Sequence, residues 1–132
     1  MIGLLGGDVQ VMFSDLPSSI EHIKTGRLRG LGLTTATRSE ALPNLPTIGE
    51  FVPGYEASSV FGLAAPKNTP AEIVDMLNKE INAALADPKI KARFAGLGGT
   101  VLPGSPADLG KLVAAETEKW GKVVKFSGAK PD

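Results

Sequence analysis

The sequence of 132 residues predicts an α/β fold in which short parallel strands are flanked by helices. A strand-like run at residues 9–13, a short helix and a second strand follow one another, which is the order of a parallel crossover. A third apolar run, at residues 56–65, leads directly into a helix. Two long helical patterns, which begin near residues 70 and 106, each carry one apolar stripe, as helices that cover a sheet do.

The first crossover is predicted near the start of the chain. Residues 9–13 combine β-branched and aromatic side chains between polar turns, so they favour a buried strand. Pro17 and Gly26 stand where a helix commonly starts and stops, which predicts a helix over residues 17–25. Leucines recur loosely over residues 27–34 and predict the second strand.

The middle of the chain is predicted to be a surface connection that ends in a strand. Residues 35–55 are rich in Pro and Gly, which favours turns, with one helical turn around residues 47–51. The apolar residues of 56–65, closed by Pro66, predict the third strand.

The rest of the chain is predicted to be mostly helical. At residues 69–72, Thr-Pro-Ala-Glu combines a capping hydroxyl, a proline at the first helical position and a carboxylate, which predicts a helix over residues 70–86. An Asp-Pro pair ends it, and a short helix over residues 89–97 and an edge strand at 100–102 are predicted next. Ser-Pro-Ala-Asp at residues 105–108 repeats the start pattern and predicts the final helix.

The composition excludes several classes of function. Fourteen basic and fourteen acidic residues leave no net charge, so the chain lacks a basic excess and no nucleic-acid partner is expected. The absence of cysteine excludes disulfides, thiolate nucleophiles and cysteine-bound metals. No apolar run approaches the roughly 20 residues of a membrane span, and no signal peptide is expected in this chain. Without a dinucleotide fingerprint or a P-loop, no cofactor is expected.

The candidate catalytic residues of the sequence do not form the pattern of an active site. His22 is the only histidine, and the sequence places no serine or carboxylate as its partner, so a structural role is preferred over a general base in a small hydrolase. A metal site would lack ligands. Glu116 and Glu118 share a helix with two lysines and suit a solvated face. Trp120 stands on the apolar stripe and is predicted to pack in a core or between lobes.

One polar cluster is a candidate binding site, and it comprises Ser14, Asp15, Ser18 and Ser19. It lies at the carboxyl end of a predicted parallel strand and at the amino end of a predicted helix, where backbone N–H groups and the helix dipole attract anions. Hydroxyls beside free amides suit a carboxylate. The alternative is that these side chains only cap the helix.

A series of short motifs runs in order along nearly the whole chain, and the series is more specific than any one of its members. The motifs are Gly6-Gly7-Asp8-Val9-Gln10-Val11-Met12-Phe13, Leu16-Pro17-Ser18, His22-Ile23-Lys24-Thr25-Gly26-Arg27-Leu28-Arg29, Arg38-Ser39, Leu42-Pro43, Pro46-Thr47, Pro53-Gly54-Tyr55-Glu56-Ala57-Ser58-Ser59, Phe61-Gly62-Leu63, Ala65-Pro66, Thr69-Pro70, Leu85-Ala86-Asp87-Pro88 and Lys119-Trp120-Gly121-Lys122-Val123-Val124. The series resembles the Bug family, the TctC-type periplasmic receptors of tripartite tricarboxylate transporters. The family usually has an acidic residue before a small polar one where this chain has Ser14 before Asp15.

The resemblance implies part of a type II periplasmic-binding-protein-like fold, in which two α/β lobes close on a small carboxylate and hand it to membrane components of the transporter. Residues 1–56 would belong to an incomplete second lobe, 57–66 would be a hinge crossover strand, and 67–132 would be the helical part of an incomplete first lobe. Ser58 and Ser59 would line the cleft. The opening half of the family pattern is not found, so a truncated receptor, periplasmic by resemblance, is expected.

A second hypothesis needs no ligand. The run at residues 9–13 would lie at an open sheet edge, and an unpaired strand is a template for another chain. The chain would then be a structural fragment that forms a homodimer through this edge.

Overall fold

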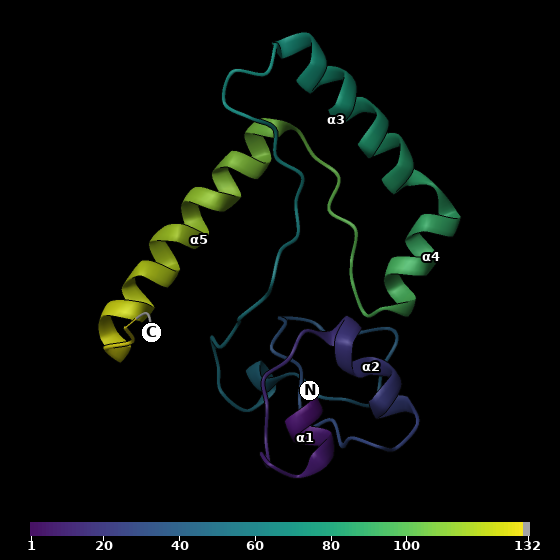
Figure 1. Cartoon of the computed structure of the whole chain (residues 1–132), viewed down its shortest axis with the longest axis vertical. Helices are drawn as coiled ribbons and strands as arrows, with labels where there is room; N and C mark the ends of the chain where they lie inside the picture. The colour runs from purple at the N-terminus through teal and green to yellow at the C-terminus, as the bar shows by residue number, and fades with distance from the viewer. Residues whose placement is uncertain (131–132) are drawn as a thin grey trace. The chain divides into compact units, whose positions relative to one another are not determined.

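A computed structural model describes residues 1–130 of the chain. Its helices are α1 (Ile2–Gly6), α2 (Leu16–Lys24), the 3-10 helix η1 (Ile48–Glu50), α3 (Ala71–Ala86), α4 (Pro88–Gly96) and α5 (Pro106–Ser127), in the order shown in Figure 1. The chain divides into two compact units. Unit 1 comprises Met1–Phe61 with Leu85–Val101, and unit 2 comprises Gly62–Ala84 with the chain from Leu102 onward.

The helices follow the start and stop patterns of the sequence. The four predicted helices are confirmed as α2, α3, α4 and α5, and η1 is the predicted helical turn around residues 47–51. At the start of α5 the hydroxyl of Ser105 accepts from the Asp108 amide (3.2 Å), and the Asp108 carboxylate accepts from the Ser105 amide (3.0 Å). These two bonds satisfy amides that have no partner inside the helix.

The strand predictions are wrong for this structure. Within residues 1–130 there is no strand, and the one parallel bridge, between Leu33 and Thr47, is isolated. The runs at residues 9–13 and 56–65 therefore form no ladder, and neither do those at 27–34 and 100–102. A strand exists only when a neighbouring segment satisfies its N–H and C=O groups, and side-chain preference alone cannot supply that neighbour.

Helix α1 was not predicted from the sequence. It is five residues long, and the residue that caps its end is Gly7, whose positive φ of 85° is the left-handed conformation common at that position. No side chain caps its start, so the sequence pattern that identified the other helices is missing here.

The small core of unit 1 lies around α2 and the bridge. Ile20 of α2 is fully buried, and Leu33 is 7% exposed. Leu33 donates from its amide to the Pro46 carbonyl (2.8 Å) and accepts from the Ile48 amide (2.8 Å). These bonds fix the start of η1 beside the buried Leu33.

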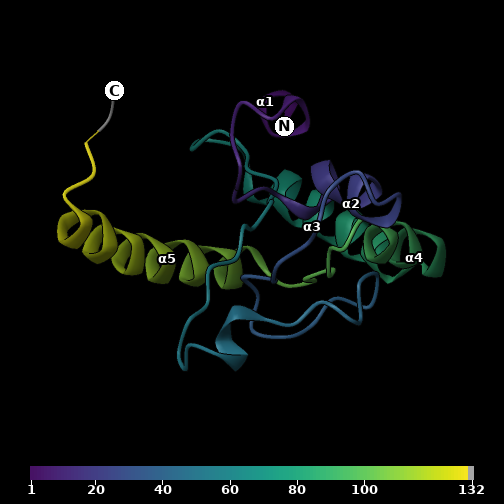
Figure 2. The same cartoon turned by 90° about the horizontal axis from the view of Figure 1, so that it is seen from below.

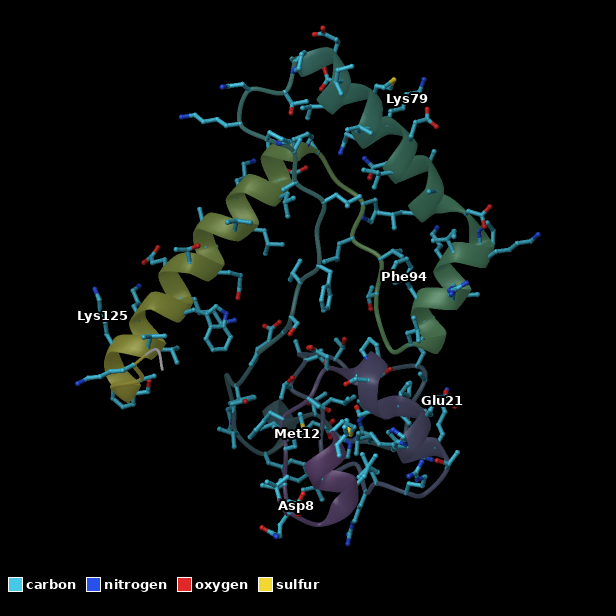
Figure 3. All side chains as sticks on the ribbon, viewed as in Figure 1. Asp8, Met12, Glu21, Lys79, Phe94 and Lys125 are labelled. Atoms are coloured by element: carbon cyan, nitrogen blue, oxygen red, sulfur yellow. The ribbon has the colours of Figure 1, made fainter. Side chains whose placement is uncertain are left out.

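Unit 2 contains most of α3 and all of α5, which Figure 2 shows as one continuous helix. Neither helix has a buried residue. Trp120 was predicted to pack in a core or between lobes, and it lies in no core here, because it is 40% exposed and its Nε1 donates to Glu116 Oε2 (2.8 Å). Packing between lobes stays a prediction. Lys79 on α3 and Lys125 on α5 carry exposed side chains, which Figure 3 labels. Between residues 1 and 130, no helix combines the length and the hydropathy needed to cross a membrane.

Candidate functional site

The amino end of α2 carries the polar cluster that the sequence singled out. Asp15 is the N-cap residue, with extended backbone (φ −63°, ψ 136°), but its side chain makes no capping hydrogen bond. The hydroxyl of Ser18 donates to the Asp15 carbonyl (2.8 Å), and the hydroxyl of buried Ser19 lies 3.3 Å from the same carbonyl and from that of Leu16. The two hydroxyl protons therefore bond the carbonyls of their own helix.

A residue far along the chain meets this helix end. Ser59 donates from Oγ to Asp15 Oδ1 over 2.9 Å, although 44 residues separate the two in sequence. Both residues lie in unit 1, and both are exposed. The Asp15 carboxylate therefore bonds Ser59 through Oδ1 and makes no capping hydrogen bond to α2.

The side chains of the other two predicted residues make no hydrogen bond to this pair in the described part of the chain. The hydroxyl of half-buried Ser58 donates to Glu56 Oε1 (3.4 Å), a neighbour on the same segment. Ser14 is exposed, and its side chain has no hydrogen-bond partner in the described part of the chain. The structure thus brings together Asp15, Ser18 and Ser19 with Ser59.

The segment that carries Ser59 is itself held by backbone bonds. Ala57 donates from its amide to the Thr34 carbonyl (2.9 Å), one residue beyond the bridge between Leu33 and Thr47. Ser59 follows two residues later, so its hydroxyl is placed by this bond and by the course of the chain that leads to it.

An ion pair that the sequence did not single out lies beside the bridge. Arg38 donates from Nε to Glu50 Oε1 (2.8 Å) and from Nη2 to Glu50 Oε2 (2.6 Å), a two-point contact. Glu50 Oε1 also accepts from the amide of buried Thr47 (3.0 Å). Hydrogen bonds from Arg38 and then from the Thr47 amide lower the pKa of Glu50 to about 2. The pattern Thr-x-x-Glu, a capping box, could have identified Glu50 from the sequence.

The charges at the helix end define what it can bind. The positive end of the α2 dipole attracts an anion, whereas an ionised Asp15 repels one that is placed directly against it. At 4 Å in water that repulsion is about 1 kcal/mol. A carboxylate therefore suits the α2 amides, and a hydroxyl or ammonium donor of a ligand suits Asp15.

Other features of unit 1 stand apart from this cluster. An apolar depression of about 360 Å³ is lined by Ile23, Gly30 and residues 41–45, none of which is a predicted site residue. His22 lies half-buried in α2. Over residues 1–130, no group of three or more His, Asp or Glu side chains is arranged to hold a metal ion.

Comparison with known proteins gives consistent matches. The family model described as "Tripartite tricarboxylate transporter family receptor" matches residues 1–129. Protein BugT of Bordetella pertussis is 36% identical over 131 residues, which make up 98% of this chain and 40% of BugT. The chain thus spans about two fifths of the length of this relative.

Two solved structures share the fold. The structure described as "R. palustris Rpa4515 with adipate" matches with a TM-score of 0.92 and 39% identity, covering 99% of this chain and 44% of that one. The periplasmic binding protein BugD matches with a TM-score of 0.90 and 33% identity, covering 100% of this chain and 45% of that one. The likeness shows the fold of periplasmic binding proteins over the length of this chain.

Proposed function

The chain belongs to the tripartite tricarboxylate transporter receptor family, as the resemblance predicted, and from this premise we propose that it forms one side of a cleft for a small carboxylate solute. The family is one of binding receptors and not of enzymes. Binding would be recognition without any covalent step, followed by delivery to the membrane components of the transporter in the periplasm.

The observation that carries the proposal is the contact between Ser59 and Asp15. Two polar segments, 44 residues apart in sequence, meet at the amino end of a nine-residue helix through a 2.9 Å hydrogen bond. Helix amino ends bind anions because their amides lack partners within the helix. At the start of α2, Pro17 has no N–H and the Ser18 amide donates to the Asp15 carbonyl (3.2 Å), so the amides of Asp15 and Leu16 are the donors in question. Adipate, the ligand named with one of the similar structures, carries two carboxylates and is a suitable first probe.

In this proposal each polar group at the start of α2 and in residues 57–59 has a separate role in binding. The amides at the start of α2 and the hydroxyl of Ser14 would donate to one carboxylate of the solute, with water filling what the protein leaves open. Ser18, whose hydroxyl proton bonds the Asp15 carbonyl, would stabilise the helix end beside it. Ser59 would hold the Asp15 carboxylate away from the amides at the start of α2, which would leave those amides to the solute. Ser19 and Ser58 would not face the solute. Each would stabilise its own segment through a local hydrogen bond, Ser19 to the Leu16 carbonyl and Ser58 to Glu56.

The proposal assigns the facing side of the cleft to the region of the receptor beyond the matched two fifths. Residues 1–56 would belong to one lobe, 57–66 would cross between lobes, and 67–132 would belong to the other lobe. Because a closed cleft takes hydrogen-bond donors from both lobes, this chain alone should bind weakly. A Kd of about 1 mM corresponds to about 4 kcal/mol, half of the binding free energy of a 1 µM site.

The test is a titration of the 132-residue chain with adipate, followed by amide NMR shifts. We expect weak, saturable shifts at residues 15–19 and 57–59, with a Kd of about 1 mM or above. Asp15→Asn should change the shifts that adipate induces at these residues. Thr117→Ala on α5 is the control and should leave them unchanged, because the Thr117 hydroxyl bonds only Val113 of its own helix. Binding at about 1 µM would contradict the one-sided cleft, and saturating shifts confined to other residues would contradict the site.

A second candidate function is self-association, and exposed apolar side chains favour it. In the run at residues 9–13, Val11 is 64% exposed and Phe13 is 76% exposed, and the run pairs with no strand among the residues described. Another copy could add to such a segment. Light scattering at rising concentration should then show a dimer that Val11→Lys abolishes, and a monomer at all concentrations would exclude it.

A further inference from the structure

The ion pair of Arg38 and Glu50 lies at the start of a continuous set of contacts within unit 1. Its two hydrogen bonds, of 2.8 and 2.6 Å, join residues that are 12 positions apart. Arg38 also donates from Nη1 to the Pro43 carbonyl (3.3 Å). The guanidinium thus ties the proline-rich connection of residues 39–46 to η1.

Glu50 connects the ion pair to the bridge between Leu33 and Thr47. Its Oε1 accepts from the amide of Thr47, which is 3% exposed, and Thr47 is the bridge partner of Leu33. A buried amide that loses its acceptor is costly, so Thr47 depends on the position of Glu50. Glu50 is in turn oriented by Arg38, because a carboxylate held at both oxygens cannot rotate freely.

The bridge is connected in turn to the segment that carries Ser59. Thr34, directly after Leu33, accepts from the Ala57 amide over 2.9 Å. Two residues beyond Ala57, the hydroxyl of Ser59 reaches the carboxylate of Asp15. The hydrogen bonds in this series are 3.0 Å or shorter, and the chain itself joins Leu33 to Thr34 and Ala57 to Ser59.

We propose that Arg38 and Glu50 are positioning residues, which through Thr47 and Ala57 hold the hydroxyl of Ser59 against Asp15. The proposal rests on the proposed function in so far as it gives the Ser59 contact a role in solute binding. Neither residue touches the solute. Partly exposed ion pairs contribute little to stability by themselves, so the effect is expected in the placement of residues 57–59 more than in overall stability.

The first test is hydrogen exchange at the Ala57 amide in the 132-residue chain. Glu50→Gln and Arg38→Gln should each speed this exchange by roughly three- to tenfold, because the bond to Thr34 then opens more often. The matched control is Glu118→Gln, which removes a 2.6 Å ion pair with Lys122 on α5 in unit 2 and should leave Ala57 unchanged. Arg38→Lys keeps the charge without the planar guanidinium, so its exchange rate at Ala57 should lie between those of wild type and Arg38→Gln. It replaces Arg38→Gln in the test if that variant does not fold.

The second test is a double-mutant cycle with adipate as the probe. If Arg38 acts on the solute through Ser59, Arg38→Gln should weaken adipate binding in the wild-type background and have no further effect beside Ser59→Ala. A purely structural role would give additive losses. Unchanged exchange at Ala57 in both Gln variants would overturn the inference, whether or not adipate binds. Faster exchange in a chain that does not bind adipate would leave the positioning of Ser59 standing and would overturn only the proposed function.

Discussion

Ser59 and Asp15 share a 2.9 Å hydrogen bond across 44 residues of sequence, and the Asp15 carboxylate that it orients makes no capping bond to α2. The helix end is therefore built from two separate segments of unit 1. The site depends on tertiary structure, because a capping aspartate alone would need no partner from residues 57–59.

The simplest prediction removes this hydroxyl. Ser59→Ala leaves Asp15 free to turn toward the α2 amides, where it would compete with an anionic solute, so adipate binding should weaken by roughly three- to tenfold. NMR titration measures the change. Ser127→Ala near the end of α5 is the matched control, since its hydroxyl bonds only Val124 of its own helix and its substitution should not alter the affinity.

Gly98 should tolerate no side chain. Its φ is +80°, and an added Cβ would overlap the side chain of Leu16 at the start of α2. Gly98→Ala should therefore lower the free energy of unfolding by about 2–3 kcal/mol, measured in urea. Gly96→Ala, two residues earlier in α4 with no atom nearby, should be neutral or stabilising by up to about 1 kcal/mol. Equal losses in both variants would contradict the close packing of Leu16.

Asn82 and Gly104 should behave as a paired unit. Asn82 donates from Nδ2 to the Gly104 carbonyl (2.9 Å) and accepts at Oδ1 from its amide (3.0 Å), which holds the approach to α5 against α3. Asn82→Ala should cost about 1–2 kcal/mol of unfolding free energy. Asn68→Ala is the control, because Asn68 is exposed and its side chain makes no described hydrogen bond.

The acid dependence of stability should reveal the ion pair of Glu50. The bonds from Arg38 and the Thr47 amide lower its pKa from 4.5 to about 2, so the folded chain holds its proton less tightly than the unfolded chain. Its stabilising effect is therefore complete above the ordinary value and is lost as the pH falls from about 4.5 toward 2. Because both side chains are partly exposed, urea unfolding of wild type and Glu50→Gln should differ only modestly at pH 7 and converge near pH 2. A constant difference across this range would contradict the assignment.

The local elements could be predicted from the sequence, whereas the contacts between segments could not. Capping residues and apolar stripes identified α2 to α5, because a helix satisfies its own backbone. The run at residues 9–13 was predicted to be a strand from side-chain preference, yet a strand needs a neighbour that these residues do not find here.

The site shows the same division. Ser18 and Ser19 were found because they stand at a helix start, and their bonds are local. Ser59 entered through the family resemblance, and nothing in the local sequence links it to Asp15. The pairing of Arg38 with Glu50 was missed for the same reason, because it joins two ends of an irregular connection.

The most direct test of the central claim is to locate adipate by intermolecular NOEs from its methylene protons to the side chains of the chain. The account predicts NOEs to the Hβ protons of Ser18 and Ser59, at the amino end of α2. NOEs confined to the apolar depression of Ile23, Gly30 and residues 41–45 would contradict it and would place the solute elsewhere in unit 1.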